Sequence, residues 1–281
     1  MKYAMIAAGE GSRLAAEGID APKPLVKVGG ECLIDRLIRI FMQQDAEEIV
    51  CICNDHTALV GQHLAALQRD GLMGRPVPLR FVVKSTPSSM HSFFEISKYL
   101  LDGPFVLTTV DTIFREDEFA AYIDAFRQCR REMLMGVTDY IDDERPLYVD
   151  TDSRMNVTAF LDTLPESPTT HHKSPSTLHE SPSTLHESPS TLHESPSTLH
   201  ESPSTLHESR TTYISGGIYG LQPEAIFTLN NCISRAERRM RNFQRALLAD
   251  RHPVKAWPFS KVLDIDHASD IQKAEQFLQK K

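Results

Sequence analysis

The 281-residue chain has little positive charge and no long apolar run. Its formal net charge is −8, whereas a nucleic-acid groove or a site for an anionic membrane needs a basic surface. No apolar run approaches the roughly 20 residues that span a bilayer. The run Tyr3–Ala8 stops at Gly9, too early for a signal peptide, and is expected to form a first β-strand. We therefore expect no nucleic-acid partner, no membrane span and a cytoplasmic location.

Cysteine is also scarce. The five cysteines are odd in number, and they form neither a CxxC pair nor a zinc-ligand spacing. Cys51 and Cys53 alternate within an apolar run, which predicts two small core side chains on one face of a strand. This usage indicates a reducing compartment.

One segment repeats without change. The heptapeptide Ser-Pro-Ser-Thr-Leu-His-Glu occurs five times between Ser174 and Glu208. Each copy contains a Pro, which excludes a continuous helix, and a single Leu, which is too little to offset the entropy of ordering the backbone. We expect a disordered insertion in a loop of one domain that covers residues 1–281. The loop would join a hairpin of two strands, Asn156–Asp162 and Thr211–Leu221.

Strand-like and helix-like segments alternate along the first half of the chain. Short apolar runs predict strands at Tyr3–Ala8, Ile49–Cys53, Leu79–Val83 and Phe105–Val110. Amphipathic stretches lie between them, and a final helix is expected after Ala268. This alternation predicts an α/β fold with a Rossmann-like, mostly parallel sheet and helices on both of its faces.

The turn after the first expected strand is rich in glycine and is followed by two cations. Gly9 and Gly11 let backbone N–H groups approach phosphate oxygens, and Arg13 and Lys23 supply positive charge. A dinucleotide fingerprint is excluded because Leu14 stands where its third Gly is needed, and no Gly-Lys-Ser/Thr of a P-loop follows. The segment therefore predicts a phosphate site of another kind.

Carboxylates follow two expected strands. Asp111 comes directly after the run Phe105–Val110, at the strand end where ligands bind in open α/β sheets. Asp264 and Asp266 lie in a late strand just before the final helix, where Asp270 is expected as a first-turn acid favoured by the helix dipole. Mg²⁺ takes one or two carboxylates together with phosphate oxygens, so Asp111 is a candidate magnesium ligand, and a helix cap is the alternative for a lone Asp after a strand.

These motifs together resemble the sugar-phosphate nucleotidyltransferase superfamily. The resemblance depends on the Gly-x-Gly-x-Arg-Leu loop at positions 9–14 and on Pro-Lys-Pro-Leu at positions 22–25, and it extends over nearly the whole chain outside the repeat. It implies a loop around the nucleoside triphosphate, cations on the departing pyrophosphate and the α-phosphate, and two acidic ligands for Mg²⁺. The residues given these roles are Ala8, Gly9 and Gly11 for the loop, Arg13 and Lys23 for the phosphates, and Asp111 with Asp266 or Asp264 for the metal.

Two further segments follow from the resemblance. Ser88 and Ser89 lie where the family contacts the base and ribose, although a helix N-cap is an alternative for them. Gly216 and Gly217 lie in a strand that the family places against the acceptor, although two glycines in a strand also fit a bulge.

The resemblance implies transfer of a nucleoside monophosphate from an NTP to a small phosphorylated acceptor, first of all a sugar-1-phosphate, with release of pyrophosphate. A cytidylyltransferase for choline phosphate or another alcohol phosphate is the alternative, indicated by Ser-Ser-Met-His-Ser and Asp-Ile-Asp. A nucleotide-binding regulator without catalysis and an interaction protein built around the repeat are further alternatives. Loss of Lys23 is expected to lower kcat and to leave stability nearly unchanged. The nucleotide and the oligomeric state stay open.

Overall fold

The computed structural model describes residues 1–142, 145–164 and 212–279. Contacts divide the chain into a unit formed by Met1–Leu164 with Thr211–Lys281 and a second unit, Pro165–Arg210. The heptapeptide repeat falls in the second unit, so the expectation of a disordered insertion lies outside the described residues. The first unit carries all the candidate site residues.

Four parallel strands form one half of a nine-stranded sheet, in the spatial order β6-β1-β4-β5. They are β1 (Lys2–Ala7), β4 (Glu48–Cys53), β5 (Leu79–Val83) and β6 (Phe105–Thr109). Each lies within one residue of a predicted strand. The prediction of a mostly parallel α/β sheet is confirmed, and the helices between these strands provide the long crossovers that parallel pairing needs.

The other half of the sheet is mixed and is built around β11, which runs antiparallel to β6, β8 and β9. β12 lies parallel to β8 at one edge, and β10 pairs with β9 at the other. The five strands are β8 (Met133–Thr138), β9 (Tyr148–Thr151), β10 (Val157–Leu161), β11 (Tyr213–Leu221) and β12 (Val254–Phe259).

The expected hairpin on either side of the repeat is wrong. β10 and β11 are both strands, as predicted, but β9 lies between them in the sheet order. Leu161 of β10 and Ile214 of β11 both pair with Tyr148, on opposite sides of β9. The two flanks of the repeat are therefore parallel to each other, with β9 between them.

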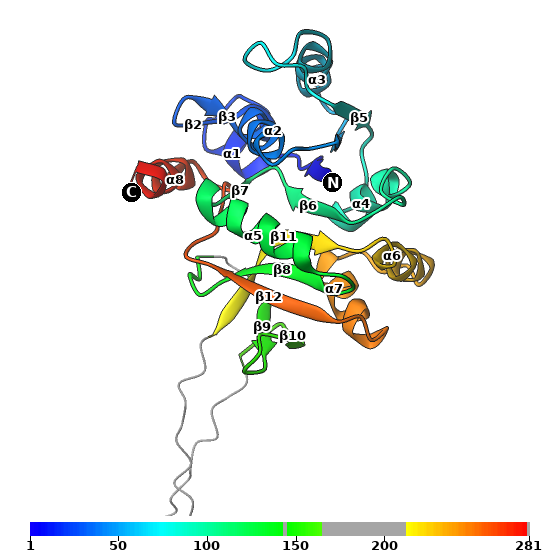
Figure 1. The fold of residues 1–281 in the computed structure, drawn as a ribbon. Coiled ribbons are helices and arrows are strands. Elements are labelled where there is room, and N and C mark those ends of the chain that lie inside the picture. The colour runs from blue at the N-terminus through cyan, green and yellow to red at the C-terminus, as the bar shows by residue number, and fades with distance from the viewer. Residues whose placement is uncertain (143–144, 165–211, 280–281) are drawn as a thin grey trace, which may run out of the picture. The chain divides into compact units, whose positions relative to one another are not determined.

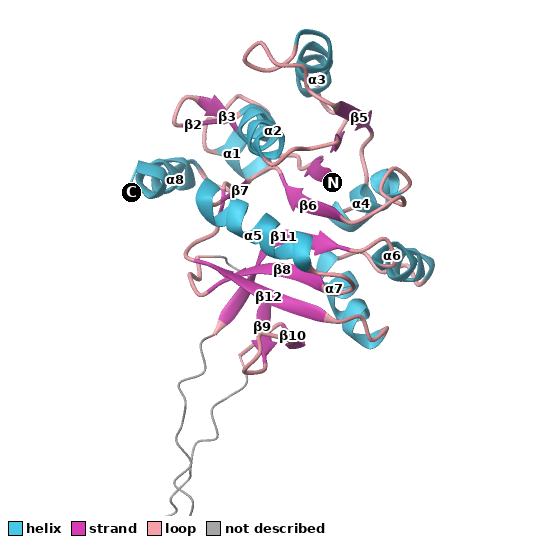
Figure 2. Ribbon diagram, in the orientation of Figure 1, coloured by secondary structure: helices cyan, strands magenta, loops and turns pink. Residues whose placement is uncertain are grey.

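Helices cover both faces of the sheet, as predicted (Figures 1 and 2). One apolar cluster joins the sheet to α2, α3, α5 and α8, and a second joins it to α4, α6 and α7. The helices are α1 (Ser12–Ala16), α2 (Leu33–Gln43), α3 (Ala58–Asp70), α4 (Ser89–Ser97), α5 (Glu116–Gln128), α6 (Ala225–Ser234), α7 (Met240–Ala249) and α8 (Ala268–Gln279).

Alternation along the central strand β1 divides the core between these two clusters. Tyr3 and Met5 belong to the first cluster, and Ala4 and Ile6 belong to the second, because successive side chains point to opposite faces. The Tyr3 ring stacks on Phe41 of α2 with centroids 4.7 Å apart. Burial on both sides makes β1 an apolar and rigid support for the loop that follows it.

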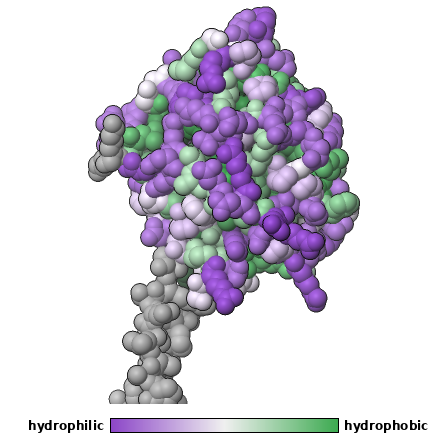
Figure 3. Space-filling model, viewed as in Figure 1, coloured by the Kyte–Doolittle hydropathy of each residue, from purple (hydrophilic) through white to green (hydrophobic). Residues whose placement is uncertain are grey.

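Apolar side chains are mostly withdrawn from the surface, and the face shown in Figure 3 is largely hydrophilic. Within the described ranges, no helix combines the length and apolarity needed to cross a bilayer. All five cysteines are free, and Cys51 and Cys53 are buried on the same strand, as predicted.

Candidate functional site

The glycine loop begins where β1 ends. Gly11 adopts a left-handed conformation, with φ of 64°, at the N-terminus of α1. A Cβ atom at this position would lie 3.0 Å from the Cβ of Lys23, closer than side chains normally approach. Gly11 therefore permits both the turn and the close approach of the segment that carries Lys23. A Cβ atom at Gly9 would meet no atom within 4 Å, so its place in the loop has no such steric cause.

Asn54 fixes this loop to the neighbouring strand. It follows β4 directly, and its amide nitrogen donates hydrogen bonds to the carbonyls of Ala8 and Gly9, both at 3.2 Å. The side chain is buried, with 8% of its surface exposed. Asn54 was not identified from the sequence. Its position as a polar residue directly after a buried strand, similar to that of Asp111, is the signal that could have indicated it.

A cluster of charges forms around Lys23, which opens a short 3₁₀ turn (Lys23–Leu25). The Lys23 ammonium forms ion pairs with Asp111 and with Asp266, the latter at 2.7 Å. Arg13 of α1 contacts the other oxygen of Asp266 at 2.9 Å. Lys23 is 8% exposed, Asp111 19% and Asp266 45%, so the cluster runs from the interior to the surface. The fold thus brings together four of the residues predicted from the sequence.

The protonation states in this cluster are set by its opposite charges. Burial alone would lower the pKa of Lys23, but Asp111 and Asp266 outweigh burial and raise it above its ordinary value. Burial would raise the pKa of Asp266, but its hydrogen bond to Lys23 and the charge of Arg13 lower it. Lys23 therefore stays a cation and Asp266 an anion at neutral pH.

A small two-stranded sheet brings the late strand to Asp111. It joins β7 (Thr112–Ile113) to β13 (Leu263–Asp264), with Asp264 opposite Thr112. The Thr112 hydroxyl donates to Asp264 at 3.4 Å, and the amide of Ile265 donates to the carbonyl of Asp111 at 3.1 Å. Asp266 follows β13 and turns to Lys23. Asp266 is therefore joined to Asp111 through Lys23.

Asp111 and Asp266 are candidate donors for a metal ion. In the ranges that the structure describes, no group of three or more His, Cys, Asp or Glu side chains is arranged to hold a metal ion. Asp111 and Asp266 do converge on one cationic group, the Lys23 ammonium. Two carboxylates are a suitable partial ligand set for Mg²⁺, which completes its shell with waters and phosphate oxygens. The pair fits a metal that arrives with a nucleotide.

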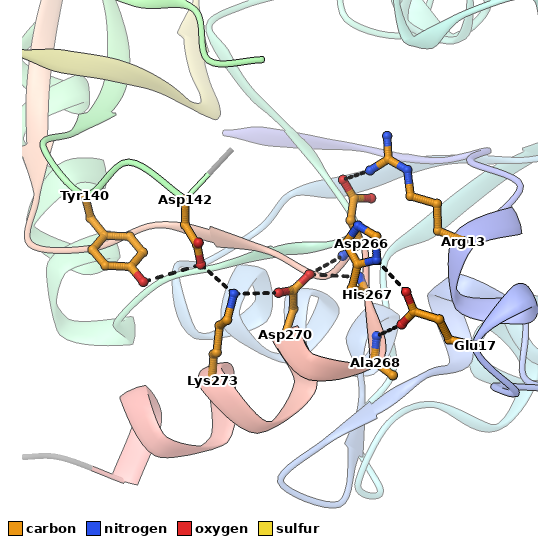
Figure 4. A network of polar contacts seen from close by, with 9 residues as sticks. All are labelled: Arg13, Glu17, Tyr140, Asp142, Asp266, His267, Ala268, Asp270 and Lys273. Atoms are coloured by element: carbon orange, nitrogen blue, oxygen red, sulfur yellow. Dashed lines mark hydrogen bonds and ion pairs between the residues drawn. The ribbon is translucent and has the colours of Figure 1, made fainter. Parts of the chain in front are cut away.

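Contacts of Glu17, directly after α1, with His267 and Ala268 hold the start of α8 next to α1 (Figure 4). His267 Nδ1 lies 2.6 Å from one Glu17 oxygen, and the amide of Ala268 donates to the other at 2.6 Å. The carboxylate of Asp270 accepts from the amides of Asp266 and His267 at 3.2 and 2.8 Å, which confirms the predicted first-turn acid. This arrangement fixes the backbone of Asp266 from two sides.

The network continues from α8 to the segment after β8, again as Figure 4 shows. Lys273 donates to Asp270 at 3.2 Å and to Asp142 at 2.9 Å, and the Tyr140 hydroxyl contacts Asp142 at 3.4 Å. These groups border a hollow of about 290 Å³ beside the Lys23 cluster. Its other lining residues include Arg13, Ser215, Gly216, Asp264, Asp266 and His267.

The predicted contacts with the nucleoside and with the acceptor fall on segments that also have structural roles. Ser88 is the N-cap of α4: its hydroxyl accepts from the amide of His91 and lies 2.9 Å from His91 Nδ1. The pairing of β11 with β8 shifts between Ser215 and Ile218, so Gly216 and Gly217 form a bulge. Ser88 and the two glycines therefore fit the structural alternatives weighed from the sequence, and Ser89 is the first residue of α4.

The surroundings of the two glycines differ. Gly217 has φ of 70°, and a Cβ there would lie 3.3 Å from the Thr112 hydroxyl. Gly216 lines the hollow beside the Lys23 cluster, and a Cβ there would lie 3.1 Å from Val262. Gly217 is thus needed for the turn next to β7, and Gly216 is the glycine with access to the hollow.

Comparisons with known proteins agree with this geometry. The family model for nucleotidyl transferases matches residues 3–281. A candidate glucose-1-phosphate thymidylyltransferase of Bacillus anthracis is similar in structure, with a TM-score of 0.72, 17% identity, and coverage of 100% of this chain and 96% of the other. No curated protein sequence matches the chain at a significant level.

Two CTP-dependent enzymes have the same fold. The inositol-1-phosphate CTP transferase of T. maritima has a TM-score of 0.66 and 15% identity, covering 99% of this chain and 96% of the other. The CTP:phosphocholine cytidylyltransferase of Streptococcus pneumoniae has a TM-score of 0.63 and 14% identity, with 99% of both chains covered. Since the family model extends over nearly the entire sequence, the chain belongs to the nucleotidyl transferase family.

Proposed function

We propose that this nucleotidyltransferase transfers the nucleoside monophosphate to a sugar-1-phosphate, and that the Lys23 cluster is its catalytic centre. The observation that carries the proposal is the convergence of Lys23, Asp111, Asp266 and Arg13 from three distant parts of the sequence at one end of the sheet. A buried cation held between two carboxylates, next to a glycine loop at a strand end, suits a phosphate chain.

In this proposal each residue has one role. The backbone of the glycine loop, supported by Asn54, surrounds the triphosphate. Lys23 donates hydrogen bonds to the α-phosphate oxygens, where negative charge builds up during transfer, and such preorganised donors dominate catalysis of this kind. Arg13 is 53% exposed at the mouth of the cluster and holds the pyrophosphate as it leaves. Ser88 and Ser89 contact the nucleoside through the edge of α4.

Asp111 and Asp266 are proposed to hold Mg²⁺, with Asp264 as a neighbouring acid. The ion supplies charge neutralisation and orientation of the phosphate oxygens when bound. The carboxylates are already paired with one cation, Lys23. With Asp111 and Asp266 holding the ion, the Lys23 ammonium would be available to the phosphate oxygens.

The acceptor's reacting phosphate is proposed to lie beside Gly216. An oxygen of this phosphate attacks the α-phosphorus, a P–O bond to the acceptor forms, and the bond to pyrophosphate breaks. A phosphate monoester is already ionised near neutral pH, so no general base is required. Neither histidine near the site is needed as one: His91 contacts Ser88, and His267 contacts Glu17.

The test is a pyrophosphate-release assay with each of the four NTPs and a panel of acceptors that includes glucose 1-phosphate, inositol 1-phosphate and choline phosphate. We expect turnover with a sugar-1-phosphate, its loss in EDTA and its return with Mg²⁺. Turnover with choline phosphate alone would replace the proposed acceptor by the alcohol-phosphate alternative. A cytoplasmic location is also proposed, since all five cysteines are free thiols.

A matched pair of variants tests the metal site. Asp111→Asn should abolish turnover and leave the fold intact, whereas Asp117→Asn, at an exposed acid on α5, should leave kcat unchanged. Full activity of Asp111→Asn would show that the proposed ligand is wrong. Circular dichroism of both variants checks that the fold is retained.

A further inference from the structure

A second hollow, of about 440 Å³, has a basic lining. It lies between the N-termini of α4 and α7, and its walls include Ser88 and Ser89 from the first and Arg238, Arg239 and Arg241 from the second. We call it the arginine hollow. The concentration of guanidinium groups is unusual in a chain whose formal net charge is −8.

Within the described ranges, two of these arginines have no acidic partner. Arg241 forms an ion pair with Asp162 and donates to the carbonyl of Arg145 at 3.0 Å, so its guanidinium is occupied. Arg238 and Arg239 are exposed, and their side chains form no ion pair or hydrogen bond with any residue of the described ranges. Adjacent guanidinium groups repel each other, and each is a planar donor suited to an oxyanion. Their position at a concave surface therefore points to an anionic ligand.

The arginine hollow borders the hollow beside the Lys23 cluster. Ser215 of β11 lines both of them. Its hydroxyl accepts from the Gln244 amide at 2.8 Å and interacts with Tyr219, another wall residue of the arginine hollow. One acceptor molecule can therefore extend from one hollow into the other.

We propose that the arginine hollow binds a second anionic group of the acceptor, a phosphate or carboxylate remote from the reacting phosphate. The inference rests on the proposed function and deepens it, because it assigns the acceptor to the class of sugar phosphates that carry two anions. Arg238 and Arg239 bind the remote anion. A quaternary ammonium is disfavoured here, since it would face the guanidinium groups of Arg238 and Arg239. Such ligands are bound by cages of several aromatic rings, and this hollow is lined by one, Tyr219.

The test compares glucose 1-phosphate with glucose 1,6-bisphosphate on the full chain. Binding is measured by calorimetry and turnover by pyrophosphate release, for the wild type and for the double variant Arg238→Gln/Arg239→Gln. The control is Arg130→Gln/Arg131→Gln, an adjacent exposed pair before β8 that makes the same change in charge. We expect the first double variant to bind the bisphosphate about 10- to 100-fold more weakly, the scale of losing one or two charge-assisted hydrogen bonds.

Affinity for the monophosphate and KM for the NTP should not change in either variant. An equal loss for both acceptors would mean that the arginines bind the reacting phosphate, and a raised KM for the NTP would mean that they bind the nucleotide; either result overturns the inference. So does bisphosphate binding that is unaffected by the arginines. A wild-type chain that binds the bisphosphate through Arg238 and Arg239 but releases no pyrophosphate would instead overturn the proposed reaction and leave the anion site intact.

Discussion

Replacing Lys23 by Ala should destabilise the protein as well as inactivate it; the expectation from the sequence that stability is nearly unchanged is revised because Lys23 is buried between two acids. The substitution removes the cation that lies between Asp111 and Asp266 and leaves two acids facing each other. Breaking a fully buried ion pair costs about 3–5 kcal/mol. Asp266 is 45% exposed, so water screens part of this penalty, and we expect the free energy of unfolding to fall by about 1–3 kcal/mol. For a domain of this size that is a decrease in Tm of about 2–12 °C.

The measurement is thermal unfolding at neutral pH, with and without Mg²⁺. Lys27→Ala is the control, because Lys27 is an exposed lysine four residues along the same segment. In the Lys23 variant, Mg²⁺ should restore part of the lost Tm, since a divalent cation can take the place of the ammonium between the carboxylates. The wild type should gain less. With saturating Mg²⁺, kcat of the variant should stay roughly 10²- to 10³-fold below wild type, the scale for one preorganised donor.

A second substitution separates charge from packing. In the Lys23→Ala background, Asp111→Asn should raise the Tm in EDTA, because it removes one of the two facing charges. If Lys23→Ala leaves the Tm in EDTA unchanged, the ammonium does not hold the acids together and the reasoning is refuted. If the Tm falls but kcat is normal, Lys23 is structural only.

Three more predictions follow from the described contacts. Gly11→Ala should lower kcat more than tenfold and stability by about 1 kcal/mol, because its Cβ would press on Lys23 from a left-handed backbone; normal kinetics would contradict this. The hydrogen bond between Glu17 and His267 lowers the pKa of Glu17 and raises that of His267, so this pair stabilises most between pH 4.5 and 6.5 and less on either side; His267→Gln should flatten the pH dependence of the Tm. Deleting residues 174–208 should keep kcat/KM within a few-fold. About 15 residues would still connect β10 to β11, and a connection of this length can reach up to about 50 Å. A total loss of activity would make the repeat part of the site.

Much of the sheet could be predicted because its parallel strands are buried on both faces. Such strands are continuous apolar runs, and Ile49–Cys53 and Leu79–Val83 can be read directly from composition. The glycine loop could be predicted because it follows β1, and Asp111 because it comes shortly after β6. The cluster residues that come just after a buried strand could therefore be found from the sequence.

Pairing partners could not be predicted in the same way. β9 has four residues, of which Val149 is the buried one, so no apolar run announces it, and the strand order around β11 stayed hidden. The burial of Lys23 depends on two carboxylates that come from positions 111 and 266, and no local pattern records such a contact. The arginine hollow likewise requires α4 and α7 to meet, and sequence periodicity says which face of each is apolar but not which ends converge.

The position of β11 has a consequence for synthesis of the chain on the ribosome. β6 (Phe105–Thr109) lies between β1 and β11, so one of its two edges cannot pair until β11 is translated, about 100 residues later. At about 5–20 residues per second, this edge stays unpaired for roughly 5–20 s. An apolar strand with an open edge is a template for pairing with another chain. The nascent N-terminal half is therefore the species most prone to aggregate, and each repeat copy inserted before β11 prolongs its exposure.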